Sequence, residues 1–218
     1  MNATGTIVTA MITPFGENGV HLEEAARLAS WLADRGNDGL VVAGSTGEGQ
    51  TLTPQERIAL FSAVKEAVAG RASVIANAGS NDTRDSVQST IAAEKAGADA
   101  ILAVVPYYNK PTQAGMLAHF GAIAQATPLP VIVYNIPGRT GVNMLPETLL
   151  ELARRHKNIV GVKESSGDLM QIGTILADRS DGFLVYSGDD HLFLPALALG
   201  ADGVVGVASH LCSPEYRR

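Results

Sequence analysis

The chain has 218 residues, 16 of them basic and 22 acidic, for a formal net charge of −6 at neutral pH. The charges are spread without long blocks of one sign, which argues against a surface for nucleic acid or an anionic membrane. No apolar run approaches the roughly 20 residues of a membrane span, and the first residues lack the features of a signal peptide. We therefore expect a cytoplasmic protein with one α/β domain over residues 1–218.

Short apolar runs recur along the chain and predict eight β-strands, at residues 7–12, 39–43, 73–77, 100–105, 130–134, 159–163, 183–187 and 203–207. Between them lie segments with helical spacing and helix start signals, at residues 22–33, 53–68, 82–96, 113–126, 146–156, 168–178 and 191–199. Continuous apolar runs are typical of parallel strands covered on both faces, and the alternation indicates βαβ units. We expect a (β/α)8 TIM barrel. An open doubly wound sheet is the alternative, although the first strand lacks its Gly-x-Gly-x-x-Gly turn.

The last residues of the sequence predict the start of another helix. Ser213, Pro214 and Glu215 have the pattern of an N-cap, a proline at the first helical position and an acidic first turn. The sequence ends at Arg218, before a helix of useful length could follow. We therefore expect the barrel to be truncated at the start of its eighth helix and to lack a C-terminal helical extension.

Polar residues and glycines gather where the predicted strands end. In a TIM barrel the carboxyl ends of the strands form the active site, so these residues are the candidates for chemistry. They are Ser45, Thr46, Tyr107, Tyr108, Tyr134, Arg139, Lys163 and Gly188, and the apolar Val205 lies at the end of the eighth strand beside them.

Lys163 ends an apolar strand, and a lysine stem at that position could simply carry its charge outward to solvent. In an apolar barrel mouth, however, the ammonium loses hydration, its pKa falls, and the neutral amine can attack a carbonyl group. Nearby tyrosines could move the protons that such chemistry needs, with the Ser45 hydroxyl as a relay. Arg139 offers a planar fork for a substrate carboxylate.

Each candidate also has a structural interpretation. Tyr134 could cover the barrel rim, and Tyr107 with Tyr108 could anchor an interface. The run of residues 189–191 (Asp-Asp-His) suits a helix N-cap better than a metal site, because no second histidine lies near it in sequence. Cys212 is the only cysteine, which excludes an intramolecular disulfide and a cysteine-based metal cluster.

Five motifs together closely resemble the dihydrodipicolinate synthase family of pyruvate-dependent class I aldolases, which is related to N-acetylneuraminate lyase. The motifs are residues 44–48 (Gly-Ser-Thr-Gly-Glu), 106–111 (Pro-Tyr-Tyr-Asn-Lys-Pro), 134–141 (Tyr-Asn-Ile-Pro-Gly-Arg-Thr-Gly), 161–164 (Gly-Val-Lys-Glu) and 187–190 (Ser-Gly-Asp-Asp). They occur in the family's order, and the resemblance runs from the first predicted strand to the eighth.

The resemblance implies that Lys163 forms a Schiff base with pyruvate and that Tyr134 is the general acid and base beside it. Ser45 and Tyr108 would complete the proton relay, with Tyr108 reaching the site of a neighbouring subunit in a homo-oligomer, either a dimer or a dimer of dimers. Arg139 would bind the carboxylate of the second substrate, L-aspartate 4-semialdehyde.

The resemblance also implies that Thr46, Val205 and Gly188 contribute to substrate binding and that the Schiff base replaces any metal or cofactor. The reaction would be that of a 4-hydroxy-tetrahydrodipicolinate synthase in diaminopimelate and lysine synthesis. Two alternatives remain. One is another pyruvate lyase or hydratase acting on sugar acids, which Arg139 disfavours, and the other is a non-catalytic barrel fragment.

Overall fold

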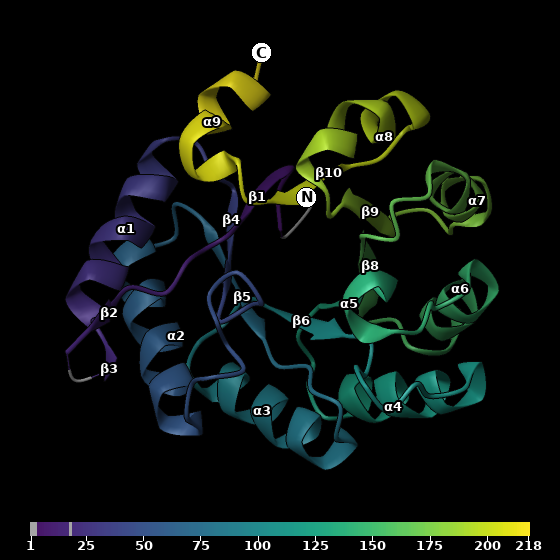
Figure 1. Ribbon diagram of the computed structural model, residues 1–218, viewed down its shortest axis with the longest axis horizontal. Coiled ribbons are helices and arrows are strands. Elements are labelled where there is room, and N and C mark those ends of the chain that lie inside the picture. The colour runs from purple at the N-terminus through teal and green to yellow at the C-terminus, as the bar shows by residue number, and fades with distance from the viewer. Residues whose placement is uncertain (1–3, 18) are drawn as a thin grey trace.

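The structure is a computed structural model that describes residues 4–17 and 19–218. Residues 1–3, which belong to the segment where we expect no signal peptide, lie outside the described residues. Within the described residues, eight parallel strands form a closed barrel in chain order, with β1 paired to β10 (Figure 1). They are β1 (Ile7–Ala10), β4 (Gly39–Val42), β5 (Ser73–Asn77), β6 (Ala100–Val104), β7 (Val131–Asn135), β8 (Ile159–Glu164), β9 (Leu184–Ser187) and β10 (Gly203–Gly206). The predicted TIM barrel is confirmed.

Helices surround the barrel, and they lie where the sequence predicts them (Figure 1). They are α1 (Leu22–Asp34), α2 (Pro54–Val68), α3 (Thr83–Lys95), α4 (Gln113–Gln125), α6 (Pro146–Arg155), α7 (Leu169–Asp178) and α8 (Phe193–Leu199). Local caps start several of them. At α2 the Thr53 hydroxyl accepts from the amide of Glu56, and the Glu56 carboxylate accepts from the amide of Thr53 at 2.8 Å, so both amides are satisfied.

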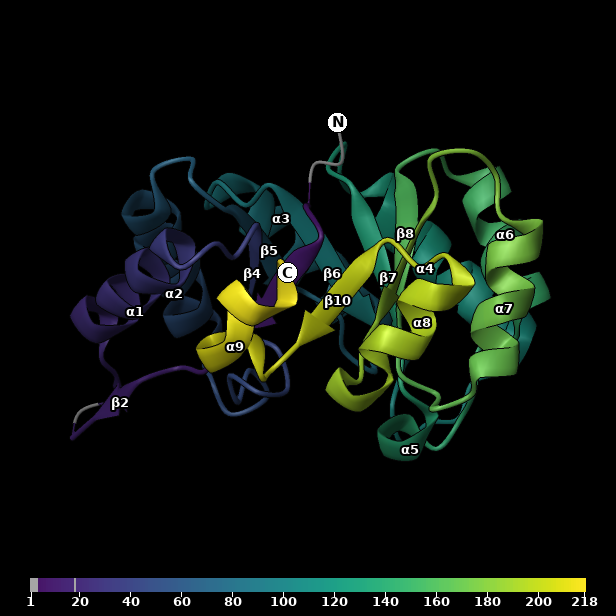
Figure 2. The same cartoon turned by 90° about the horizontal axis from the view of Figure 1, so that it is seen from above.

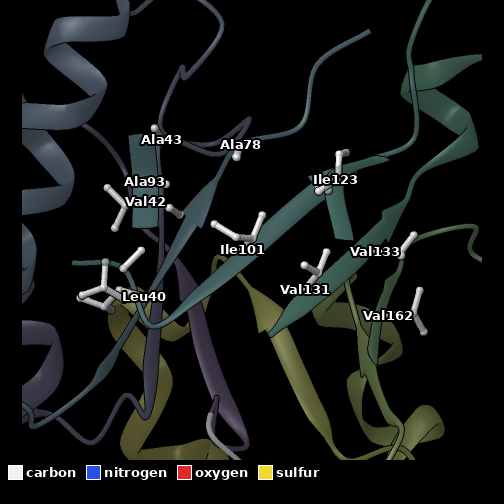
Figure 3. Close-up of a cluster of buried hydrophobic side chains, with 14 of the residues drawn as sticks. Leu40, Val42, Ala43, Ala78, Ala93, Ile101, Ile123, Val131, Val133 and Val162 are labelled. Carbon is white, nitrogen blue, oxygen red and sulfur yellow. The ribbon is translucent and has the colours of Figure 1, made fainter. Parts of the chain in front are cut away.

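The strands are buried on both faces. On β4, Leu40 and Val42 pack outward beneath the helices, in the layer that Figure 3 shows, whereas Val41 points into the barrel. On β7, Val133 lies in the same outer layer and Ile132 lies inside. Each strand therefore needs apolar side chains at successive positions, which explains why the strand runs are apolar throughout.

The pairing between β7 and β8 contains a one-residue bulge. Val131 pairs with Ile159, but the next residue, Ile132, pairs with Gly161. Val160 is thus an extra residue on β8, and its side chain packs against the inner cluster. A bulge of this kind interrupts the regular alternation of side chains along a strand.

The bulge changes which residues of β8 face inward. Ile159 and Val162 both lie in the outer layer, although they are three residues apart and strict alternation would place them on opposite faces. Lys163 consequently points into the barrel. Position 161, within the same strand, accepts only glycine, because a Cβ there would lie 2.6 Å from the carbonyl oxygen of Leu184.

Three small elements escaped the sequence analysis. The two-residue strands β2 (Phe15–Gly16) and β3 (Gly19–Val20) form an antiparallel hairpin beside α1, and α5 (Pro137–Thr140) follows β7. A 3₁₀ turn, η1 (Asp190–Leu192), precedes α8, so the helix predicted from residue 191 begins two residues later. Among the described residues, no helix combines the length and apolar character needed to cross a bilayer.

The predicted start of the last helix, at Ser213, is wrong. α9 (Ser209–Tyr216) takes the position of the eighth helix, between α1 and α8 in Figure 1. Ser213 and Pro214 lie inside α9 and do not start it. Buried hydroxyl contacts hold the helix against the barrel, with Ser209 Oγ lying 2.6 Å from Thr9 Oγ1.

A distant carboxylate sets the start of α9. Asp190 accepts hydrogen bonds from the backbone amides of Val207 at 3.0 Å and Ala208 at 3.2 Å, and the Tyr216 hydroxyl donates to it at 3.1 Å. The amides that precede the helix are therefore satisfied by a side chain from η1, which no local pattern in the sequence indicates.

Candidate active site

Lys163 lies at the end of β8, inside the barrel, and its side chain is only 6% exposed. It pairs with Tyr134 on β7 and with Tyr186 on β9. Burial lowers the pKa of Lys163 to about 8, against the opposing effect of the negative charges on Asp189 and Asp190. The outward-pointing interpretation is therefore wrong, and an appreciable fraction of this lysine is a neutral amine at neutral pH.

Tyr134 lies beside the lysine. The Nζ atom of Lys163 is 4.3 Å from the centre of the Tyr134 ring, and Tyr134 belongs to the apolar cluster inside the barrel. Burial raises the pKa of Tyr134, with the positive charge of Arg139 among the smaller opposing effects. The phenol therefore keeps its proton at neutral pH and can donate it next to the amine.

A cavity of about 240 Å³ opens at the carboxyl end of the barrel. Its lining residues come from the end of β6 and from the segments after β4, β6 and β7, and they are Ser45, Gln50, Val104, Tyr107, Ile136, Arg139 and Thr140. α5, which carries Arg139, lies at the opposite end of the barrel from the start of β1 (Figure 2). The Arg139 charge contributes to lowering the pKa of Lys163, so the guanidinium and the amine share one electrostatic site.

The loops around this cavity have unusual backbone conformations. Non-glycine residues with positive φ occur after β4, at Ala43 (55°) and Glu48 (53°), and after β6, at Tyr108 (70°) and Lys110 (46°). Such conformations are unfavourable for residues with a side chain, and they concentrate at functional sites. The loops that carry Ser45 and Tyr108 are thus held in conformations that the surrounding structure imposes.

The remaining predicted site residues lie at varying distances from the lysine. Gly188 is next to it, since a Cβ there would lie 3.0 Å from Lys163 Cε. Val205 is buried in the same inner cluster as Tyr134, and Thr46 is half-buried in the loop after β4.

Tyr108 is the exception. Its side chain is 88% exposed and points away from the barrel, whereas its neighbour Tyr107 lines the cavity. Within residues 4–17 and 19–218, no hydrogen bond joins Ser45, Tyr108 and Tyr134, so a single chain does not assemble the expected relay.

The sequence analysis missed Glu164, which directly follows the lysine. It faces the opposite side of β8 and is 2% exposed. Its carboxylate accepts hydrogen bonds from Asn135 Nδ2 at 3.0 Å, from the Ser166 amide at 2.7 Å and from Gln171 Nε2 at 3.1 Å. Burial raises the pKa of Glu164. A charged residue at a buried strand position was the signal that could have revealed it.

Asn143 extends this network toward the Arg139 loop. Its Oδ1 accepts from Asn135 Nδ2 at 2.7 Å, and its Nδ2 donates to Gln171 Oε1 at 2.8 Å. Its backbone oxygen accepts from Gln113 Nε2 at 2.8 Å. The segment that follows α5 is therefore fastened to β7, β8, α4 and α7, and this fixes the loop that presents Arg139.

The Asp-Asp-His run does not act as predicted. Asp189 occupies the N-cap position of η1 but makes no capping hydrogen bond with its side chain, while Asp190 binds amides at the start of α9. In the part of the chain that the structure describes, no group of three histidine, cysteine or acidic side chains could hold a metal ion.

A closed barrel with a buried, low-pKa lysine facing a tyrosine defines a Schiff-base-forming aldolase. Comparison with known proteins gives the particular family. The profile of the dihydrodipicolinate synthetase family, whose members are lyases, matches residues 3–218, and the chain belongs to this family.

Relatives of known activity and structure are similar over nearly the whole chain. The 4-hydroxy-tetrahydrodipicolinate synthase of Synechococcus sp. (strain JA-2-3B'a(2-13)) is 54% identical over 208 residues, which are 95% of this chain and 68% of that protein. The enzyme of the same name from Bacillus subtilis (strain 168) is 50% identical over 215 residues, 98% of this chain and 74% of that protein. A solved dihydrodipicolinate synthase from Cyanidioschyzon merolae, with lysine bound, matches with a TM-score of 0.98 and 50% identity, covering 100% of this chain and 74% of that one.

Proposed function

We propose that this protein is a 4-hydroxy-tetrahydrodipicolinate synthase that condenses pyruvate with L-aspartate 4-semialdehyde through an imine on Lys163, in the diaminopimelate route to lysine. The observation that carries the proposal is a lysine with a pKa of about 8, buried in the barrel mouth and facing the Tyr134 phenol. The imine carries the reaction, so the mechanism needs no metal or cofactor.

The first stage binds pyruvate covalently. The neutral Nζ of Lys163 attacks the keto carbon, and the resulting carbinolamine loses its hydroxyl as water after receiving a proton from the Tyr134 phenol. Ser45 relays protons between this phenol and the cavity. Thr46 and Val205 contact the bound pyruvate from the ends of β4 and β10.

In the second stage the Tyr134 phenolate, left by the first stage, takes a proton from the pyruvate methyl group, and the iminium becomes an enamine. The enamine carbon forms a bond to the aldehyde carbon of the semialdehyde, whose oxygen takes up a proton. The amino group of the semialdehyde then attacks the imine carbon, which closes the ring and releases the Lys163 amine. The lysine is thereby regenerated for another turnover.

Arg139 selects the second substrate. It lines the cavity from α5, and the Asn143 network holds the adjoining segment in place. Its planar guanidinium binds the carboxylate of the semialdehyde through paired hydrogen bonds. This cation favours an amino-acid aldehyde over the sugar acids of the alternative lyase or hydratase.

Trapping the imine tests the proposal. The protein is incubated with pyruvate and borohydride, its intact mass is measured, and the modified peptide is mapped. We expect the reduced adduct on Lys163, no adduct in Lys163→Ala, and an unchanged adduct in Lys157→Ala, a control that removes an exposed lysine preceding β8. An adduct retained in Lys163→Ala would refute the assignment.

Tyr108 completes the proton relay of a neighbouring subunit in a homo-oligomer, a dimer or a dimer of dimers. Its 88% exposure and left-handed backbone support this role, because the side chain projects away from its own barrel. Mixing the Tyr108→Phe and Lys163→Ala variants, each with low activity, tests it. Mixed oligomers should regain activity, since one site then has both residues intact. No recovery after verified subunit exchange would contradict a role across the interface.

A further inference from the structure

Ser165 is a buried hydroxyl beside the candidate lysine. Its amide donates to Asn135 at 2.8 Å, which continues the pairing of β8 with β7 beyond the end of the strand. Because it stands two residues after Lys163, it lies on the same, inward face of the strand. The residue is 8% exposed, and its Oγ has no hydrogen-bond partner among the described residues.

Gly188 shows how closely the hydroxyl and the lysine approach each other. A Cβ built on Gly188 would lie 1.8 Å from Ser165 Oγ and 3.0 Å from Lys163 Cε. The hydroxyl and the lysine stem therefore lie against the same point of the backbone after β9. Glycine is required there because the hydroxyl already fills the space that a side chain would occupy.

The hydroxyl also lies next to the phenol of Tyr134. It lowers the pKa of that phenol, against the larger effect of burial, although the two groups form no hydrogen bond of ordinary geometry. A buried hydroxyl without a partner is unfavourable, and native structures rarely keep one without a ligand or a bound water. The hydroxyl is thus near both the lysine stem and the phenol, where an adduct on Lys163 would form.

We propose that Ser165 is a further catalytic residue, whose hydroxyl donates a hydrogen bond to the carbinolamine oxygen of the pyruvate adduct on Lys163. The inference rests on the proposed function, since it needs that adduct. Ser165 keeps its proton throughout, and the proton that leaves with the water comes from Tyr134. The hydrogen bond holds the leaving oxygen toward the phenol and so speeds the dehydration step.

The test compares Ser165→Ala with wild type and with Ser166→Ala. The first variant removes the hydroxyl without adding volume. The control removes a neighbouring hydroxyl whose Oγ accepts from the Asp168 amide at 3.2 Å, away from the lysine. Adduct formation with pyruvate is followed in time by borohydride quenching, across a range of pH, and circular dichroism confirms that each variant is folded.

We expect Ser165→Ala to form the adduct on the order of tenfold more slowly or worse, in line with the loss of one hydrogen bond to a developing charge. Its alkaline limit should move to higher pH, because the phenol loses a neighbour that lowers its pKa, and a purely structural residue would not shift this limit. Ser166→Ala should behave as wild type.

Two failures can be told apart. If wild type forms no adduct on Lys163, the proposed function itself fails. If wild type reacts and a folded Ser165→Ala reacts at the same rate with the same pH limit, the hydroxyl holds only a bound water and the catalytic role is overturned.

Discussion

Replacing Lys163 with methionine is expected to stabilise the fold at neutral pH while abolishing the imine. Methionine is similar in length and carries no charge. The pKa of Lys163 falls from 10.5 to about 8, and a difference of one in pKa corresponds to about 1.4 kcal/mol. Holding the charged side chain in the barrel therefore lowers the free energy of unfolding by about 3 kcal/mol at pH 7. The contact between the Lys163 ammonium and the Tyr134 ring offsets about 1 kcal/mol of this cost.

The sign of the pH dependence follows from the direction of the shift. The pKa of Lys163 is lower in the folded chain than in the unfolded one, so the unfolded chain binds this proton more tightly. The cost is fully present below about pH 8 and disappears as the pH rises from about 8 to 10.5. The advantage of the methionine variant should therefore be large at pH 7 and small near pH 10.

Urea denaturation at pH 7 and pH 10, followed by circular dichroism, measures both quantities. Lys157→Met serves as the matched control, because that exposed lysine precedes the same strand, and its substitution should change the free energy of unfolding little at either pH. A Lys163→Met variant that is no more stable than wild type at pH 7, or equally stabilised at both pH values, would refute the reasoning.

Three further predictions concern specificity and stability. Arg139→Ala should raise the KM for the semialdehyde by about tenfold or more, the loss of a charge-assisted hydrogen bond, and should weaken pyruvate trapping far less, since Arg139 is only a minor influence on the pKa of Lys163. Equal losses in steady-state kinetics and in trapping would make Arg139 structural. Thr53→Ala should remove the cap of α2 and lower the free energy of unfolding by about 1 kcal/mol, a fall in Tm of about 2–4 °C by calorimetry. An unchanged Tm would mean that the capping box contributes nothing. Glu164→Ala removes the acceptor of three hydrogen bonds in a largely buried network and should destabilise the fold by about 3 kcal/mol in urea, and Glu164→Gln by less. Equal stability of the two variants would exclude this origin.

Most of the fold could be predicted because its determinants are local. Barrel strands covered on both faces require continuous apolar runs, and helices such as α2 start at caps that the sequence displays, as at Thr53. α9 could not be predicted, because its start depends on Asp190, a residue that folding brings to it from η1. The local pattern at Ser213 indicated a helix start that the tertiary contacts override.

The candidate site was predictable to the extent that barrel geometry gathers strand ends. Lys163, Tyr134 and Gly188 are brought together for that reason alone. Ser165 and Glu164 were missed because their roles depend on which face of β8 each occupies, and the bulge at residue 160 hides that alternation from the sequence. The exposure of Tyr108 could not be predicted either, because its backbone is left-handed and the residue types in this loop do not indicate that conformation.

Because of the bulge in β8, the reactivity of this protein depends on how the strand pairs with its neighbour and not only on which residues it contains. If all six residues of β8 paired regularly, with Val160 inside the ladder and no bulge, alternation from Ile159 would turn Lys163 toward the helices and Glu164 toward the inside of the barrel. A carboxylate facing pyruvate would leave the barrel folded but without its nucleophile. Gly161, which has no reactive group, is part of this arrangement, because a Cβ there would lie 2.6 Å from the carbonyl oxygen of Leu184 and would disturb the pairing that turns Lys163 inward.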